Sequence, residues 1–193
     1  MVDKINVDNL SDEELVEITI SNQENFLYLI KRYETKLIRY IRRISGINLE
    51  DAEDVIQEVF IKTYQNLNFF DKDLKFSSWI YRIAHNEVIS NFRKKQARAK
   101  EINFDNDDFI NNIVGDADIS KDIDLAFLKE NIGEILSKMD IKYREVLILK
   151  FLEEKDYREI SDILKKPMGT VATLINRAKK QFRDVLKKSN IQL

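Results

Sequence analysis

Apolar residues recur along this chain at intervals of three and four positions, and long alternating runs are missing. This spacing is typical of amphipathic α-helices, so the pattern predicts an all-α protein. The first helix is expected to begin at Ser11, because Ser11 and Glu14 have the spacing of a capping box. Three further helices are predicted in the N-terminal half, over residues 25–44, 51–67 and 77–100.

The helical pattern is lost between Glu101 and Asp124, where the composition becomes polar and acidic. A segment of this kind buries too little apolar surface to fold by itself, so a flexible acidic linker is expected over residues 99–124. Helical spacing resumes after it and continues almost to the end of the chain. The sequence therefore predicts two small helical domains, residues 8–98 and residues 125–190, joined by this linker.

The C-terminal domain contains three helical patterns, and the turn before the last one holds the only proline, Pro167, and one of four glycines, Gly169. Proline fits the first turn of a helix and glycine permits a sharp change of direction, so we expect a tight turn that starts a helix over residues 169–188. Apolar residues from Val171 to Leu186 form one stripe on this helix. The opposite face carries hydrogen-bonding and cationic side chains: Thr173, Asn176, Arg177 and Lys180.

Two amphipathic helices joined by a short turn, with polar and basic residues on the free face of the second, are typical of a helix-turn-helix. Such a helix fits the major groove of DNA, where Asn and Arg pair with base edges and Lys neutralises phosphate. The alternative is an ordinary three-helix bundle with a basic outer face. The pattern favours DNA binding.

Charge is segregated along the chain, although the net charge is only −2. Residues 1–75 carry 10 basic and 15 acidic groups, and residues 101–140 carry 3 and 11. Residues 76–100 carry 6 basic groups against 1 acidic, and residues 141–193 carry 13 against 7. Two basic zones divided by an acidic one indicate two separate contacts with a polyanion, although a solvated surface with chance clustering is the alternative.

Composition excludes several kinds of chemistry. The chain has no cysteine, which rules out disulfides, thiolate zinc sites and thiol nucleophiles, and its only histidine is His85. We therefore expect no catalytic residue, no metal and no cofactor, and we interpret His85 as a surface residue or a neighbour of phosphate. No run approaches the roughly 18 apolar residues of a membrane span, and no secretory signal is recognisable, so a cytoplasmic protein is expected.

Two helices of the N-terminal domain carry candidate binding surfaces. On residues 51–67, the side chains opposite the apolar face are Asp54, Gln57, Glu58 and Ile61, which form either a solvated face or a docking surface. The next helix and the loop before it combine aromatic and basic residues, the mixture that strand opening requires, because unpaired bases must be stacked while cations hold phosphates. Trp79 shares a face with Ile80 and Ile83, so a core position is favoured for it over a base contact.

Two stretches resemble one known family. "MDIKYREVLILKFLEEKDYREISDILKKPMGTVATLINRAKKQF" resembles region four of bacterial sigma factors, especially the extracytoplasmic-function (ECF) group. "DAEDVIQEVFIKTYQNLNFF" and "KFSSWIYRIAHNEVISNFRKK" are similar, nearly position for position, to parts of region two of the same group. The resemblance covers nearly the whole chain, with both regions in the family's order.

The resemblance implies site residues in three groups. The clamp helices of the polymerase β′ subunit would contact Asp54, Gln57, Glu58 and Ile61. The minus-ten promoter element would contact Phe76, Trp79, Tyr81, Arg82, His85, Asn86, Arg93 and Lys94, with Asn86 as the main base contact. The minus-thirty-five element would contact Lys150, Thr170, Thr173, Asn176, Arg177 and Lys180. Ala172 and Leu174 stand where the family carries cations, which predicts an altered or weakened minus-thirty-five preference.

The resemblance also implies partners and a function. The expected protein is an alternative sigma factor, a monomer when free, that binds core RNA polymerase (β′ clamp helices and β flap) and promoter DNA and is restrained by an anti-sigma factor. The linker would thread the polymerase cleft and mimic RNA there, or serve as a simple tether. The rival hypotheses are a free-standing helix-turn-helix regulator, which would bind duplex DNA alone, and a helical scaffold that needs no DNA. An enzyme is the poorest fit.

Overall fold

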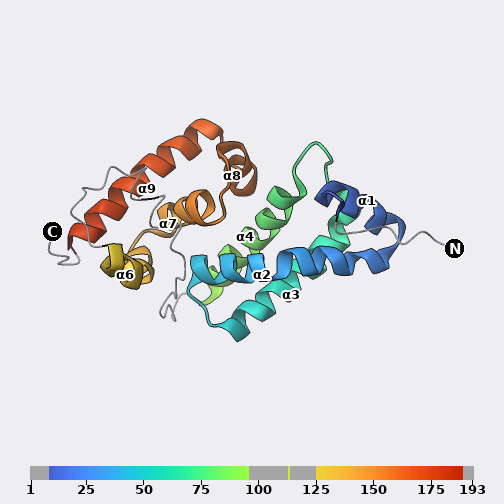
Figure 1. Cartoon of the computed structure of the whole chain (residues 1–193), viewed down its shortest axis with the longest axis horizontal. Helices are drawn as coiled ribbons and strands as arrows, with labels where there is room; N and C mark the ends of the chain where they lie inside the picture. Colours follow the sequence, from blue (N-terminus) through green and yellow to red (C-terminus); the bar gives the residue numbers. More distant parts are fainter. Residues whose placement is uncertain (1–8, 96–112, 114–124, 189–193) are drawn as a thin grey trace.

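The computed structural model describes residues 9–95, 113 and 125–188, which form two groups of helices (Figure 1). For residues 91–95 and 125–130 only the backbone is described. The N-terminal group comprises α1 (Asp12–Ser21), η2 (Gln23–Asn25), α2 (Phe26–Ser45), α3 (Leu49–Asn66), η3 (Leu67–Phe69) and α4 (Phe76–Lys95). The C-terminal group comprises α6 (Leu125–Ser137), α7 (Ile141–Leu147), the π-helical segment η4 (Ile148–Leu152), α8 (Tyr157–Leu164) and α9 (Met168–Lys188). These ranges contain no strand, and the predicted all-α class is confirmed.

Local sequence signals fix where the helices begin and end. The predicted capping box is present at α1, where the Ser11 hydroxyl accepts the N–H of Glu14 and the Glu14 carboxylate accepts the N–H of Ser11. Helix α2 ends at Gly46, whose φ of 70° lies in the left-handed region that glycine adopts without strain. The same type of capping box starts α8, with Asp156 in the place of the serine.

The capping box of α1 should contribute measurably to the stability of the protein. Replacing Ser11 by alanine leaves the N–H of Glu14 without its acceptor, and we expect a loss of about 1 kcal/mol in the free energy of unfolding. Ser21→Ala, at the exposed C-terminal end of the same helix, is the matched control and should change stability by far less. Urea unfolding followed by circular dichroism measures both, and equal effects would contradict a capping role for Ser11.

The core of the N-terminal group lies between α2, α3 and α4. At its centre the ring of Phe76 is fully buried and packs edge-on against Tyr33 and Phe70, with Trp79 beside it. Helix α4 starts at this cluster, and the N–H of Phe76 donates to the Glu13 carboxylate of α1 at 2.9 Å. The aromatic residues before and within α4 therefore anchor this helix and its preceding loop to the domain.

In the C-terminal group α9 packs along α7 and α8. The predicted apolar stripe is the buried face of α9, with Phe182 and Ile175 fully enclosed. Two members of the stripe, Leu174 and Val185, lie at its edge and are only partly buried. The division of α9 into an apolar inner face and a polar outer face is thus as predicted.

The turn between α8 and α9 differs from the prediction. The residue in the left-handed conformation is Lys165, with φ 53°, and Gly169 already lies in the first turn of α9. A β-carbon added at Gly169 would meet no atom within 4 Å, so neither backbone conformation nor space requires glycine there. Pro167 precedes α9, and its carbonyl accepts the N–H groups of Thr170 and Val171. The sharp change of direction is therefore made two residues before the proline.

The two groups pack directly against each other. Helix α8 lies against α4, and α2 contacts both α7 and η4 (Figure 1). The buried apolar side chains of both groups belong to one continuous core. Most of the predicted linker, residues 99–124, lies outside the described residues, but Ile113 within it is fully buried. The structure thus adds an interface between the groups that the hydrophobic pattern did not predict.

Candidate polymerase and nucleic-acid interfaces

The predicted polymerase-facing side of α3 is open to solvent. Asp54, Gln57, Glu58 and Ile61 are all exposed. Ile61 retains 49% of its accessible surface, while Val55, Ile56 and Val59 on the opposite side are buried. The result is an acidic strip with one apolar side chain, supported by a well-packed inner face. This geometry suits a docking surface, and the role of the four residues stays a prediction.

Residues predicted to contact the minus-ten element divide into buried and accessible sets. Phe76, Trp79 and Tyr81 are buried, with Phe76 at 0% exposure, so in this arrangement their side chains do not reach a ligand outside the protein. The position of Trp79 agrees with the favoured interpretation as a core residue. Asn86 is exposed and Arg82 is half-buried. Arg93 and Lys94 lie in the last turn of α4, and their side chains are outside the described residues.

His85 is not the surface residue that was expected. Its side chain is only 13% exposed, and it faces the C-terminal group. Nδ1 lies 3.5 Å from the Tyr40 hydroxyl, and Nε2 lies 3.9 Å from the carboxylate of Glu145 on α7. A single histidine on an amphipathic helix gives no sign of such a contact, because the partner lies far away in the sequence.

The polar face of α9 is accessible. All five predicted residues on it are exposed: Thr170, Thr173, Asn176, Arg177 and Lys180. The Thr173 hydroxyl donates to the carbonyl of Gly169 at 2.9 Å, which leaves its oxygen free to accept. Lys150 lies apart from this face, half-buried on η4, with its ammonium 5.4 Å from the ring centre of Tyr157. Ala172 and Leu174 are partly buried, so neither offers a polar group beside the exposed set.

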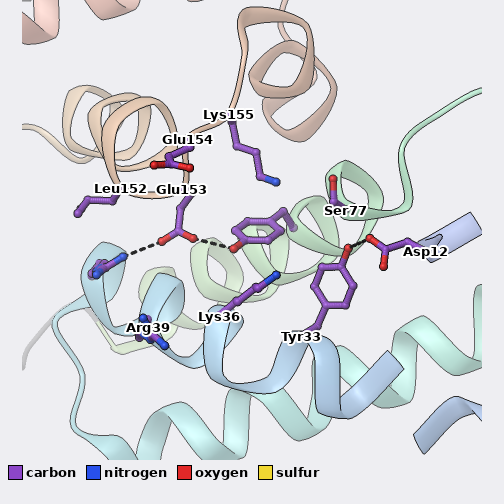
Figure 2. Close-up of a pocket in the computed structure, with 11 residues that line it drawn as sticks. Asp12, Tyr33, Lys36, Arg39, Ser77, Leu152, Glu153, Glu154 and Lys155 are labelled. Atoms are coloured by element: carbon purple, nitrogen blue, oxygen red, sulfur yellow. Dashed lines mark hydrogen bonds and ion pairs between the residues drawn. The ribbon is translucent and has the colours of Figure 1, made fainter. Parts of the chain in front are cut away.

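The interface between the two groups centres on Glu153, directly after η4. Its Oε1 accepts from Arg43 Nη1 of α2 at 2.9 Å, and its Oε2 accepts from the Tyr81 hydroxyl of α4 at 2.6 Å. Figure 2 shows this carboxylate pointing from the C-terminal group to both partners, in a pocket that Lys36 and Lys155 also line. Burial, together with the nearby Glu153 charge, raises the pKa of Tyr81, so its hydroxyl keeps the proton it donates.

Further ionic contacts surround Glu153. The ammonium of Lys155 lies 4.7 Å from the ring centre of Tyr81, and burial lowers the pKa of Lys155. Lys75, in the loop before α4, lies 3.3 Å from Glu159 and 3.8 Å from Asp156 of the C-terminal group. Neither Arg43 nor Glu153 is predictable from the sequence, because a charged residue that forms a buried ion pair at a helix end has the same pattern as a solvated one.

The contact between His85 and Glu145 has an unusual proton balance. Burial, with a smaller effect of the Lys166 charge, lowers the pKa of His85 to about 4. Burial raises the pKa of Glu145 to about 7, against the opposing charges of Lys166 and Arg144. Between about pH 4.5 and 6.5 both groups are neutral in the folded chain, whereas in the unfolded chain the histidine is protonated and the carboxylate is ionised. Both states then hold one proton on the pair, and its two contributions to the pH dependence of stability cancel.

Replacing either residue alone should reveal the contribution of the other to the pH dependence of stability. In Glu145→Gln the unfolded chain binds one more proton than the folded chain between about pH 4 and 6.5, so stability should fall on acidification by up to about 1.4 kcal/mol per pH unit. In His85→Gln the folded chain binds the extra proton between about pH 4.5 and 7, so stability should fall as the pH rises. Urea unfolding from pH 4.5 to 6.5 compares each slope with that of the unsubstituted chain. If both substitutions changed the slope of stability against pH in the same direction relative to the unsubstituted chain, this proton balance would be contradicted.

Comparisons with known proteins agree with this architecture. Sigma-70 region 2 matches residues 29–98, and Sigma-70 region 4 matches residues 129–182. The ECF RNA polymerase sigma factor SigW of Bacillus subtilis (strain 168) is 34% identical over 176 residues, which cover 89% of this chain and 94% of SigW. The ECF RNA polymerase sigma-E factor of Escherichia coli (strain K12) is 30% identical over 178 residues, which cover 89% of this chain and 92% of the sigma-E factor.

This chain belongs to the ECF group of RNA polymerase sigma factors, as its sequence resemblance predicted. Two solved structures share the fold. CnrH in complex with the cytosolic domain of CnrY has a TM-score of 0.66 at 24% identity, covering 92% of this chain and 97% of CnrH. The sigma factor RpoE in complex with the anti-sigma factor NepR from Bartonella quintana has a TM-score of 0.61 at 17% identity, covering 85% of this chain and 98% of the matched chain. Among the described residues no helix has the length and apolarity to cross a membrane.

Proposed function

We propose that this protein binds core RNA polymerase, directs it to specific promoters and helps to melt the DNA for initiation. The observation that carries the proposal is the presence of sigma regions two and four, in that order, within a chain 34% identical to an ECF sigma factor over 89% of its length. In this function the protein supplies binding and positioning and has no catalytic residue of its own. It acts in the cytoplasm, where an anti-sigma factor restrains it.

The exposed face of α3 is proposed to bind the β′ clamp helices. Ile61 shares this exposed face with two acids and a glutamine, and its apolar side chain, half exposed, gains by burial in an interface. The acids steer the encounter with a basic partner, and the apolar residue contributes to the lifetime of the complex. The C-terminal group is proposed to contact the β flap.

Helix α4 is proposed to bind the minus-ten element, and Asn86 is its best-placed base contact because the side chain is exposed and offers both a donor and an acceptor. Phe76 and Trp79 then act indirectly, by holding α4 and the loop before it in place. On α9, Asn176, Arg177 and Lys180 are proposed to contact the minus-thirty-five element. Ala172 and Leu174 add no charge to that face.

Transcription with purified components tests the proposal. Core polymerase, with and without the full chain, is supplied with fragmented genomic DNA of the source organism, and the transcript starts are sequenced. Starts that share upstream motifs and need the protein are expected. A double Arg177→Ala, Lys180→Ala variant should lose most of these starts, whereas a protein that works without DNA contacts would tolerate it. Tight duplex binding by the chain alone, without new starts, would favour a free-standing regulator instead.

A further inference from the structure

The contact between the two groups covers a part of the proposed DNA-binding surface. The acidic turn (Glu153, Asp156 and Glu159) of the C-terminal group faces Arg43, Lys75 and Tyr81 of the N-terminal group. Strand opening requires cations for phosphates and aromatic rings for bases, and both kinds of side chain are present here. In the closed arrangement these side chains face carboxylates, which are anionic oxygen acceptors as phosphates are.

Glu153 is the most buried of the three acids; Glu159 is nearly as enclosed, at 13% exposure, and Asp156 is exposed. The side chains of Glu153 and Arg43 are 7% and 9% exposed, whereas Lys75 and Asp156 are both well exposed. Exposed pairs are screened by salt and contribute little, but a buried carboxylate that loses a partner is left uncompensated. Each oxygen of Glu153 accepts one bond from the opposite group, so the closed contact depends on this one side chain more than on its neighbours.

Such a contact is sensitive to the loss of a single partner, yet it opens readily when the two groups separate completely. When the groups separate completely, Glu153, Arg43 and Tyr81 all return to water, and hydration replaces much of what the buried contact provided. A partner that binds the separated groups can therefore open it by a modest difference in affinity. Lys75 itself is well exposed, so its contacts with Asp156 and Glu159 offer less resistance.

We propose that Glu153 is a latch that holds the free protein closed, with the acidic turn in the place of nucleic acid, and that binding to polymerase opens it. The proposal rests on the proposed function, because it assigns nucleic-acid binding to the α4 surface. It predicts that the free chain binds single-stranded DNA weakly and that loss of the latch strengthens this binding without a new DNA contact.

Glu153→Gln is the test variant, because it keeps the size of the side chain and removes its charge. The amide oxygen can still accept from Arg43 and the amide nitrogen can donate to the Tyr81 oxygen, but neither bond then involves a carboxylate, and the buried Arg43 charge loses its counter-ion. Glu154→Gln is the matched control: Glu154 is the adjacent residue, lines the same pocket and is exposed. Circular dichroism and urea unfolding establish that each variant folds, and Tyr81→Phe, which removes a single hydroxyl, is a second variant for the distance measurement.

The distance between the groups is measurable in the full chain, because the natural sequence has no cysteine. Cysteines introduced at the exposed positions Gln65 on α3 and Asp184 on α9 accept a donor and an acceptor dye for single-molecule energy transfer. A single high-transfer population is expected for the unsubstituted chain and for Glu154→Gln, also in high salt. Glu153→Gln should shift most molecules to low transfer, and Tyr81→Phe should shift a smaller share.

Affinity for a short single-stranded DNA of mixed sequence, measured by fluorescence anisotropy, should rise about tenfold in Glu153→Gln, about the size expected when a hydrogen bond to a charged group becomes a neutral one. Transcription by the assembled polymerase should be equal for both glutamine variants, since the latch is already open there. A Glu153→Gln chain that folds, stays closed and binds DNA like the control would overturn the latch. Absence of transcription by every variant would instead overturn the proposed function, while the energy-transfer result would still decide the latch.

Discussion

Replacing Phe182 by alanine is expected to destabilise the C-terminal group by about 3–5 kcal/mol, the range for removing a fully enclosed aromatic side chain. Phe182 is completely buried on α9, in the face that packs along α7. The group is a small set of helices, so neighbouring side chains have little freedom to fill the space that the ring leaves. A loss of this size is a large fraction of the stability of a typical domain.

Urea unfolding followed by circular dichroism measures this loss, with Asp184→Ala as the control. Asp184 lies two residues further along the same helix and is exposed, so its replacement should change stability by no more than about 0.5 kcal/mol. If Phe182→Ala behaved like Asp184→Ala, the packing of α9 against α7 would not be the source of the stability of this group.

Reversing the charge of the exposed α3 face should strongly reduce the affinity for core polymerase. We expect Asp54→Lys combined with Glu58→Lys to weaken binding to core polymerase at least about tenfold, because two attractive contacts become repulsive in the proposed interface with a basic partner. Both side chains are exposed, so the fold should remain intact. Most of the change should appear in the association rate and should shrink as the salt concentration rises.

Surface plasmon resonance with immobilised core polymerase measures this effect. The control, Glu24→Lys combined with Glu34→Lys, makes the same change in net charge at exposed positions outside α3. It separates the specific contact from a general effect of charge. If both variants weakened binding equally, the α3 face would not be the specific contact with polymerase. Unchanged binding by a correctly folded α3 variant would lead to the same conclusion.

Much of the fold was predictable because the signals are local. The capping box at Ser11 and the apolar stripe of α9 each depend on residues within a few turns of one another, and the structure agrees with both. The turn before α9 was predicted less well. Gly169 suggested a sharp turn because of its residue type, but the left-handed conformation is adopted by Lys165, which no rule of composition favours.

The site was predictable only where side chains face away from the core. The periodic pattern correctly placed Glu58 and Arg177 on exposed faces. It did not predict the burial of Tyr81 or His85, because each faces a carboxylate of the other group of helices. An interface made by charged residues from distant parts of the chain leaves no hydrophobic period in either segment.

The π-helical segment η4 affects how this chain should be compared with its relatives. A π-helical turn holds an extra residue relative to a regular α-helix, and it behaves locally as a one-residue insertion. Removal of one residue between Ile148 and Leu152 would therefore restore a regular α-helical turn, because the bond from the N–H of Glu153 to the carbonyl of Ile148 would then span four residues instead of five. Glu153 would keep nearly the same direction toward α2 and α4. A gap of one position at this point in a relative is thus compatible with the same contact wherever the glutamate itself is present.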